Sequence, residues 1–313
     1  MSREADPEPT RPEAARPTSL RPASSGPASS GPARRTVIVT GASSGIGEVA
    51  AARLAAAGDD VAVVGRDPER TRAVAERIGA TAFLADFERL DDVRALADAL
   101  LQRYEHIDVL ANNAGGLYHE RRVTVDGHER TIQLNHLAPF LLTHLLRPRL
   151  EETAASGRDV RVVSTASMAN LFGRLRLDDL DWERRRWRGG WRAYGTAKIA
   201  TILFAVELAE RLTGTGVTAY SFHPGTVVTR FGSSSPLIRF GGAVTGGRYG
   251  VTPEAGAAPL ERLAGPVPVG APSGTYFDRF TANGRVSAQA KDPQLGRDLW
   301  ALSEGLMGVA VRG

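Results

Sequence analysis

Short apolar runs rich in β-branched side chains alternate with longer helical stretches from residue 36 onward. The apolar runs predict strands at 36–40, 61–65, 82–85, 107–111, 160–163 and 217–222. The stretches between them predict helices at 46–57, 68–78, 90–104, about 125–153 and 191–212. Such short strands, alternating with helices of about twelve residues or more, are typical of βαβ units. The pattern therefore predicts an α/β fold with a doubly wound parallel sheet.

The first 34 residues differ in composition from the rest of the chain. They are mostly Pro, Ser, Ala and Arg, with almost no large apolar side chains. Such a segment buries too little apolar surface to offset the entropy lost on ordering, so residues 1–34 are predicted to be a disordered tail. A targeting role is the alternative interpretation. No composition break after residue 36 marks a second domain, and residues 35–313 are predicted to form a single domain.

The composition excludes several classes of function. Of the 313 residues, 42% are hydrophobic and 24% charged, as in an ordinary soluble globular protein. The chain has no cysteine, which excludes disulfides, thiolate nucleophiles and Cys-ligated zinc. No apolar run reaches the roughly 18 residues of a membrane span, and no secretory signal is recognisable, so we expect a cytoplasmic protein without a transmembrane segment. The six histidines show no metal-ligand spacing, and no metal is expected.

The net charge of +4 is spread along the chain, with one exception. Residues 182–192 hold three of the four tryptophans and five arginines. This Arg/Trp loop could bind nucleic acid, anionic lipid or an acidic substrate. The other interpretation is a surface loop whose tryptophans pack on the body and whose arginines are solvated. We favour the surface loop and expect no nucleic acid partner, while a homo-oligomer remains possible.

A glycine-rich turn, Thr40-Gly-Ala-Ser-Ser-Gly-Ile-Gly47, lies between the first predicted strand and the first helix. Glycines there let the backbone approach a pyrophosphate, while the helix N-terminus presents free N–H groups. Similar turns also occur only to let a helix pack closely on a strand. The residues expected to contact a dinucleotide are Gly41, Ser43, Ser44, Gly45, Ile46 and Gly47.

Three further motifs accompany this turn, and together they resemble the short-chain dehydrogenase/reductase family. Asn112-Asn113-Ala114-Gly115 follows the fourth strand, Tyr194-Gly-Thr-Ala-Lys198 opens the helix after the fifth, and Pro224-Gly225 follows the sixth. The resemblance covers nearly everything after residue 34. It implies a Rossmann-type fold, a nicotinamide cofactor and hydride exchange with a small-molecule carbonyl or alcohol. The cofactor contacts it implies beyond the turn are Asp86, Phe87, Asn113, Ala114, Gly115, Tyr194, Lys198, Pro224, Gly225, Val227 and Thr229.

The end of the second strand bears on which nicotinamide cofactor binds. NAD sites place a carboxylate there for the ribose 2′-hydroxyl, whereas NADP sites need a cation for the 2′-phosphate. Arg66 stands at that point, and its guanidinium fork suits a phosphate, although Asp67 is adjacent. The sequence therefore predicts NADP(H) as the cofactor.

Tyr194 and Lys198 are four positions apart on a predicted helix, hence on one face. A neighbouring ammonium lowers the pKa of a phenol, which lets the phenol exchange a proton more readily. A chance pair on a wet helix face is the alternative, but the chain has only two lysines, Lys198 and Lys291. This scarcity favours a functional pair. The family often has Ser before the lysine, and Ala197 stands there instead.

The resemblance completes the catalytic set with Ser167 and Asn135. Ser167 is expected to hydrogen-bond the substrate oxygen beside Tyr194, with Ser164 and Thr165 as rivals for that role. Asn135 matches the asparagine that kinks its helix and holds a water in the proton relay. The alternative to the whole set is an NADP-binding regulator without catalysis, and the intact catalytic residues argue against it.

The spacing from Ser167 to Tyr194 is longer than in the smaller members of the family. This long form, with the C-terminal pattern from Ser273 onward, resembles the retinol dehydrogenase-like branch, which also contains bacterial ketoreductases. The resemblance implies reduction of a ketone or aldehyde on a lipophilic or polycyclic substrate. Residues 231–250, rich in Gly and Ser, are expected to form a lid over that substrate.

Overall fold

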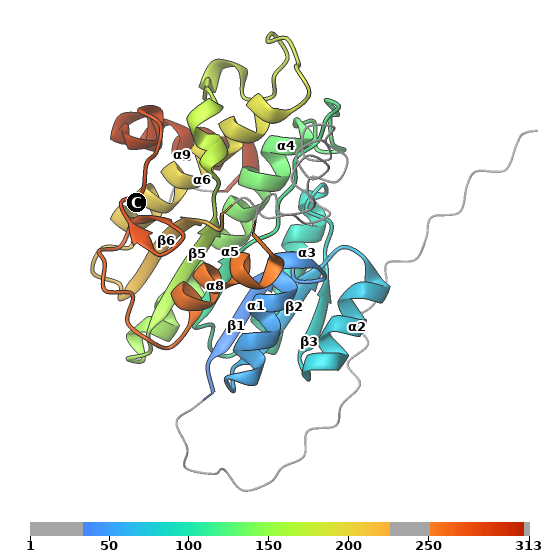
Figure 1. Ribbon diagram of the computed structural model, residues 1–313, viewed down its shortest axis with the longest axis vertical. Helices are drawn as coiled ribbons and strands as arrows, with labels where there is room; N and C mark the ends of the chain where they lie inside the picture. Colours follow the sequence, from blue (N-terminus) through green and yellow to red (C-terminus); the bar gives the residue numbers. More distant parts are fainter. Residues whose placement is uncertain (1–33, 226–250, 310–313) are drawn as a thin grey trace, which may run out of the picture. The chain divides into compact units, whose positions relative to one another are not determined.

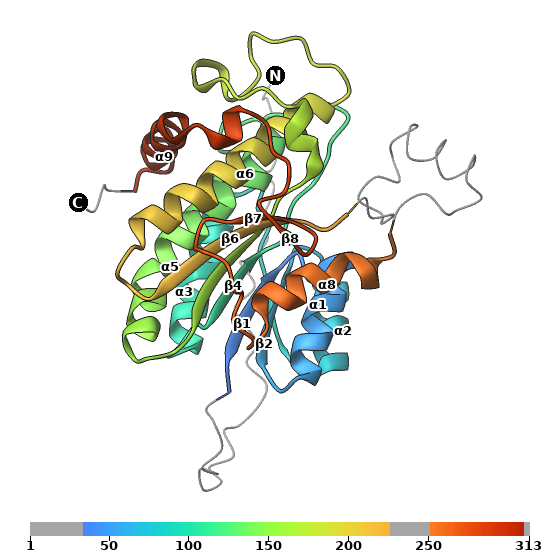
Figure 2. The same cartoon turned by 60° about the vertical axis from the view of Figure 1, so that its left-hand side comes forward.

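The computed structural model describes residues 34–225 and 251–309. Within these ranges eight strands form one sheet in the order β3-β2-β1-β4-β5-β6-β7-β8 (Figure 1 and Figure 2). Neighbouring strands pair in parallel, except that β8 pairs antiparallel with β7 at one edge. The strands are β1 Thr36–Thr40, β2 Asp60–Gly65, β3 Thr81–Leu84, β4 Val109–Asn112, β5 Val160–Thr165, β6 Val217–His223, β7 Tyr276–Asp278 and β8 Thr281–Ala282. The predicted α/β fold is confirmed.

Helices cover both faces of the sheet (Figure 2). Helices α3, α5 and α6 pack on one face, and α1, α2 and α8 pack on the other. The longer helices are α1 Gly45–Ala56, α2 Pro68–Ile78, α3 Leu90–Arg103, α5 Ala138–Ala155, α6 Trp191–Arg211, α8 Pro253–Ala264 and α9 Pro293–Met307. The short helical pieces are α4 Arg130–Ile132, the π-helical η1 Gln133–Leu137, and the 3-10 turns η2 Met168–Phe172, η3 Leu177–Asp179 and η5 Gln289–Lys291.

The central strands are buried on both sides. In β1, Ile38 packs into one helical layer, while Val37 and Val39 pack into the other. This double burial explains why the apolar runs in the sequence are continuous rather than alternating. The strand order reverses between β1 and β4, and the carboxyl ends of these two strands flank the crevice where such folds bind ligands.

The helix predicted at about 125–153 is wrong at its start. Residues 125–129 are not helical, because Gly127 turns the chain with φ +86° and Glu129 caps the helix that follows. The Glu129 carboxylate accepts hydrogen bonds from the backbone N–H groups of Thr131 and Ile132, at 2.8 and 3.1 Å. The helix therefore begins at Arg130, passes through the π-helical turn η1 and continues as α5.

Several elements after β6 were not predicted, namely α8, β7, β8 and α9. The predicted lid at 231–250 and almost all of the predicted tail lie outside the described residues. Arg34 is described, and it donates hydrogen bonds to the backbone oxygens of Gly58 and Asp59. Across 34–225 and 251–309, no helix combines the length and hydropathy that crossing a membrane requires.

Candidate active site

The glycine-rich turn between β1 and α1 packs against the segment that follows β4. Gly41 has φ +66°, and a Cβ there would lie 2.8 Å from Ala114 Cα. A Cβ on Gly47 would lie 2.5 Å from Asn113 Nδ2. Ser44 precedes α1 without a side-chain cap, so the first N–H groups of the helix remain available for an anion. The turn therefore has room for backbone atoms only and lies at the N-terminus of a helix, as a pyrophosphate-binding turn does.

Asn113 ties the ends of three strands together. Its Nδ2 donates to Thr40 O at 3.0 Å, and its Oδ1 accepts from Thr165 Oγ1 at 3.2 Å. Thr40 Oγ1 accepts from the backbone N–H groups of Asn113 and Ala114, both at 3.0 Å. The described structure thus gives this asparagine a structural role at the crevice. Its predicted contact with the cofactor stays a prediction.

Arg66 lies at the end of β2 with 57% of its side chain exposed. Its Nη1 is 3.0 Å from Glu88 Oε1 and 3.8 Å from Asp86 Oδ1. The same Glu88 oxygen accepts from Arg130 Nη2 at 2.6 Å, and the Arg130 guanidinium carbon lies 3.7 Å from the centre of the Tyr118 ring. Arg66 is therefore an accessible cation already paired with an acid. Sequence reasoning missed Glu88, because its partners are 22 and 42 positions away.

Asp67 and Phe87, two other residues considered in the sequence, make contacts within the protein. Asp67 caps α2, where its carboxylate accepts from Arg70 N at 3.0 Å, and this bond lowers the pKa of Asp67. The carboxylate that stands beside Arg66 in the sequence is thus engaged with α2. The Phe87 side chain is buried in the core, and its carbonyl accepts from Gln133 Nε2 at 3.3 Å.

Tyr194 and Lys198 lie in the first half of α6, where both side chains are buried. Lys198 Nζ is 5.3 Å from the centre of the Tyr194 ring and donates to Thr165 O at 2.7 Å. This bond fixes the ammonium between α6 and the end of β5. The predicted arrangement on a single helix face is therefore present, and the burial of both side chains argues against the alternative of a chance pair on a wet face.

Burial shifts the pKa of both groups. Burial raises the pKa of the Tyr194 phenol well above its usual value, while a hydrogen bond with the Ser167 side chain acts in the opposite direction. Burial lowers the pKa of Lys198 to about 7. The lowered phenol pKa that was expected from the neighbouring ammonium is therefore not found, and Tyr194 is protonated at neutral pH. Lys198 gains or loses its proton close to neutrality.

The structure separates Ser167 from its two rivals. Ser167 hydrogen-bonds Tyr194, and its Oγ also accepts from Ala169 N at 3.2 Å at the start of η2. Thr165 Oγ1 donates to Asn113 Oδ1 at 3.2 Å. Ser164 is buried within β5 with 2% of its surface exposed. Of these three hydroxyls, the Ser167 hydroxyl is the one the structure pairs with Tyr194.

Asn135 lies in the π-helical turn η1, two residues after its start. Its Nδ2 donates to Gly116 O and Thr131 O at 2.9 and 2.8 Å, and its Oδ1 accepts from Gly116 N at 3.2 Å. A Cβ on Gly115 would lie 2.6 Å from Asn135 Oδ1 and 3.5 Å from Lys198 Nζ. The structure therefore brings Asn135, Lys198 and the glycine after β4 together. The expected irregularity in this helix is a π turn.

Two glycines that sequence reasoning missed set the distance between η2 and α6. A Cβ on Gly195 would lie 2.4 Å from Ala169 O, and a Cβ on Gly173 would lie 2.3 Å from the carbonyl carbon of Gly195. Only backbone fits at this crossing, so the segment that begins at Ser167 lies directly against the first turn of α6. A glycine directly after the tyrosine, in a predicted helix, was the available signal.

Pro224 and Gly225 close the described part of the chain after β6, and Gly225 has φ +94°. Val227 and Thr229, which the resemblance implies as cofactor contacts, lie outside the described residues. Ser43 is part of the β1–α1 turn and contacts Gly65, where an added Cβ would lie 2.9 Å from Ser43 Cβ. The turn is thus packed against the end of β2, next to Arg66.

The Arg/Trp loop packs on the body of the protein. Trp182 is buried, its ring meets Trp187 edge to face at 5.8 Å, and Trp187 Nε1 donates to His119 O at 2.6 Å. Arg185 stacks on Trp182 at 3.8 Å and pairs with Asp179 at 2.8 Å. These contacts favour the surface-loop interpretation over an anionic-surface binder.

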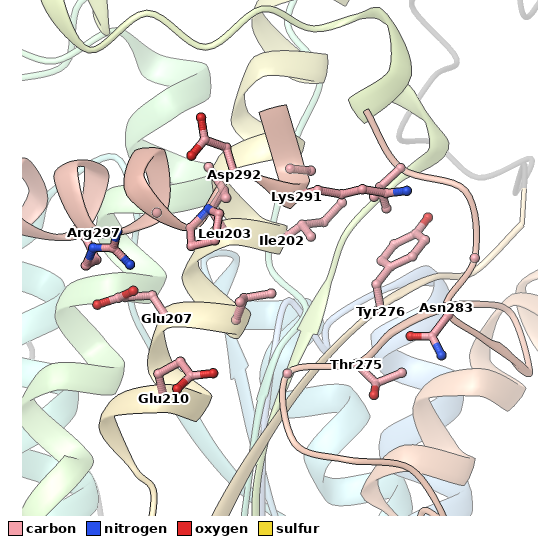
Figure 3. A pocket seen from close by; sticks show the side chains of 17 residues that line it. Ile202, Leu203, Glu207, Glu210, Thr275, Tyr276, Asn283, Lys291, Asp292 and Arg297 are labelled. Carbon is pink, nitrogen blue, oxygen red and sulfur yellow. The ribbon is translucent and has the colours of Figure 1, made fainter. Parts of the chain in front are cut away.

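A cavity of about 740 Å³ lies between α6, the start of β7 and the start of α9 (Figure 3). Ile202, Leu203 and Tyr276 line it, together with charged residues such as the buried Glu207 and the exposed Arg297. None of the predicted catalytic or cofactor-binding residues within the described ranges lines it. The cavity shares α6 with Tyr194 and Lys198 but is separate from them.

Known proteins resemble the chain over most of its length. The family described as short chain dehydrogenase matches residues 35–176. A curated protein of Streptomyces sp. (strain C5), named "Putative daunorubicin C-13 ketoreductase DnrU", is 42% identical over 289 residues, which cover 89% of this chain and 94% of that protein. The chain belongs to the short-chain dehydrogenase family.

Other similar proteins belong to the same family. Retinol dehydrogenase 13 of Homo sapiens is 35% identical over 287 residues, which cover 88% of this chain and 85% of that protein. The crystal structure of 3-ketoacyl-(acyl-carrier-protein) reductase from Brucella melitensis complexed with NADH has a TM-score of 0.62 and 25% identity, covering 80% of this chain and 98% of that chain. The predicted resemblance to the retinol dehydrogenase-like and bacterial ketoreductase branch is confirmed.

Membership in this family makes the chain an oxidoreductase that acts on CH–OH or C=O groups of a small molecule with a nicotinamide cofactor. The described residues fit such a cofactor. The turn at Gly41 and Gly47 has room for backbone only, and the N-terminus of α1 offers N–H groups. Arg66 supplies an accessible cation at the end of β2. The hydrogen-bonding groups and the positive charge of these residues both match a dinucleotide.

Proposed function

We propose that the protein is an NADP(H)-dependent reductase of ketones or aldehydes on lipophilic or polycyclic molecules. One observation carries the catalytic part of the proposal. The Tyr194 hydroxyl is hydrogen-bonded to Ser167, with the Lys198 ammonium 5.3 Å from its ring. An acid, a second hydrogen-bond donor and a cation are thus gathered at the carboxyl ends of the central strands, where this fold class binds its ligands.

The bound cofactor supplies the hydride, and the residues of this chain handle the proton. Burial keeps Tyr194 protonated, which is the form that donates a proton to the oxygen of a carbonyl being reduced. Ser167 donates a hydrogen bond to the same oxygen as negative charge develops there. Lys198 stabilises the phenolate left on Tyr194, and its pKa of about 7 suits the return of a proton.

Arg66 supports NADP(H) rather than NAD(H). Its side chain is accessible, and Asp67, the carboxylate next to it in the sequence, is engaged as the cap of α2. Glu88 holds Arg66 in an exposed ion pair, which costs little to exchange for a phosphate. The doubly charged 2′-phosphate is the stronger partner for a guanidinium fork.

Exposed apolar side chains support a lipophilic substrate. Met168 and Phe172 are exposed on η2, directly after Ser167, and Trp191 is exposed at the start of α6. The Trp191 ring meets the Tyr194 ring edge to face at 6.3 Å. Apolar surface beside a polar catalytic group is the usual composition of a small-molecule site. The name given to the Streptomyces relative supports a ketone as the reacting group.

A panel of carbonyl compounds tests the proposal by the loss of NADPH absorbance. The panel spans aliphatic aldehydes, steroids and polycyclic ketones, each with NADPH and with NADH. We expect turnover on at least one lipophilic ketone, and we expect Tyr194→Phe to abolish it while NADPH binding stays near normal, since only the transferable proton is removed. Turnover retained in Tyr194→Phe would contradict the role of Tyr194. NADPH binding without turnover on any carbonyl would favour the non-catalytic regulator.

A further inference from the structure

Three buried polar atoms close to the proposed catalytic residue Asn135 have no hydrogen-bond partner among the described residues. They are Asn112 Oδ1 on β4, His136 Nδ1 in η1 and Ser164 Oγ on β5. The same three residues line one cavity of about 10 Å³, together with Asn135 and Thr165. That volume is about the smallest that can hold one water molecule. Buried polar groups are rarely left unpaired, so the coincidence of three at one small cavity calls for a ligand.

The neighbours of His136 fix which of its ring nitrogens carries the proton. Ser303 Oγ donates its one proton to Leu299 O at 2.8 Å. The contact of 2.8 Å between His136 Nε2 and Ser303 Oγ therefore has the histidine as donor. Nδ1 is then an acceptor with a free lone pair. Burial lowers the pKa of His136 to about 3, which keeps the ring neutral.

The neighbours of Asn112 fix its amide in the same way. Thr143 Oγ1 donates to Pro139 O at 2.8 Å, so it accepts from Asn112 Nδ2 at 2.9 Å. The Asn112 Oδ1 atom is thus the acceptor that remains unpaired. The Ser164 hydroxyl is the one unpaired group of the three that can donate. The cavity therefore presents two acceptors and one donor, which matches the two protons and the lone pairs of water.

We infer that one ordered water molecule is bound among Asn112, His136 and Ser164, donating to the first two and accepting from the third. This water joins the π-helical turn to β4 and β5. Asn135 and Thr165 also line the cavity that holds this water, and the Thr165 carbonyl accepts a hydrogen bond from Lys198. The inference rests on hydrogen-bond geometry and does not depend on the proposed cofactor or substrate.

A crystal structure of the full chain, at a resolution that shows ordered solvent, tests the site directly. We expect one solvent peak at about 2.7–3.2 Å from His136 Nδ1, Asn112 Oδ1 and Ser164 Oγ. Absence of the peak, or a peak that contacts fewer than two of these atoms, would overturn the inference.

A matched pair of variants tests the contribution of the water to stability. Ser164 and Ser221 are register partners on β5 and β6, and both have a buried hydroxyl without a partner in the described chain. Only Ser164 of the two lines the cavity. We expect Ser164→Ala to lower Tm by about 2–4 °C, because the water loses its donor, and Ser221→Ala to leave Tm unchanged or raise it. Equal changes in Tm would overturn the role of Ser164 as the donor.

Discussion

Replacement of Arg66 by alanine provides the sharpest test of cofactor choice. In the structure Arg66 already has an ion-pair partner, because its guanidinium pairs with Glu88 at 3.0 Å and lies 3.8 Å from Asp86. A 2′-phosphate must therefore replace Glu88 as its partner. The gain from Arg66 is the difference between the new pair and the old one.

The magnitude follows from the exposure of the existing pair. An exposed ion pair is worth about 0.2–1 kcal/mol, whereas a charge-assisted hydrogen bond to phosphate is worth about 1.5–3 kcal/mol. The exchange therefore favours NADPH by about 0.5–2.8 kcal/mol, which is about 2- to 100-fold in affinity. Arg66→Ala should weaken NADPH by that factor and leave NADH nearly unchanged. Arg66→Asp should go further and favour NADH.

Removal of the competitor should act in the opposite direction. Glu88→Gln frees Arg66 from a pair worth at most about 1 kcal/mol, so NADPH should bind about 1.4- to 5-fold more tightly. Arg297→Ala removes an exposed arginine from α9 and serves as the charge-matched control, with no effect on either cofactor. Titration of both cofactors against the four variants decides the matter. A wild type that prefers NADH, or an NADPH constant that Arg66→Ala leaves unmoved, refutes the reasoning.

Four further predictions concern Lys198, His136 and the N-terminal segment. Lys198→Arg should severely reduce turnover and weaken cofactor binding, although it keeps the positive charge. Wild-type rates in this variant would contradict the proposed roles of Lys198 in stabilising the Tyr194 phenolate and in contacting the cofactor. In the wild type, kcat/KM for NADPH should fall as pH rises through about 7, where Lys198 loses its proton, and this titration should be absent from Lys198→Arg. Burial lowers the pKa of His136 to about 3, so between pH 6.5 and 3 this histidine is protonated in the unfolded chain only, and stability is lost as pH falls. The pH dependence of Tm should therefore be shallower in His136→Gln than in the wild type. Parallel Tm curves for the two proteins would contradict this. Deletion of residues 1–33, which keeps the Arg34 contacts with Gly58 and Asp59, should change neither Tm nor kinetics, and a lower Tm would show that the tail docks.

The sheet could be predicted because its strands are buried on both faces and therefore read as continuous apolar runs. The elements after β6 could not be predicted in the same way. Strands β7 and β8 have three and two residues, which is too short for any periodicity to show. Their position depends on pairing with β6, and the partners in that pairing lie more than fifty positions apart in the sequence.

The catalytic set could be predicted from motifs, and the structure brings Ser167, Tyr194, Lys198 and Asn135 to one place, although their roles remain predictions. The surroundings of these residues could not be predicted. The π turn at η1 depends on tertiary contacts such as those of Asn135 with Gly116, and composition does not distinguish it from an α-helix. The pairing of Arg66 with Glu88 likewise depends on how β2 and the segment after β3 meet.

The scarcity of lysine has a practical consequence for chemical labelling. Lys198 is 3% exposed, whereas Lys291 is exposed and lines the cavity between α6 and α9 (Figure 3). Among the side chains of the described residues, an amine-directed reagent such as a succinimidyl ester therefore meets one accessible target. A dye or a surface tether can be attached at Lys291 without touching the proposed catalytic groups. Slow acylation of Lys198 would in turn report the opening of the contact between α6 and β5.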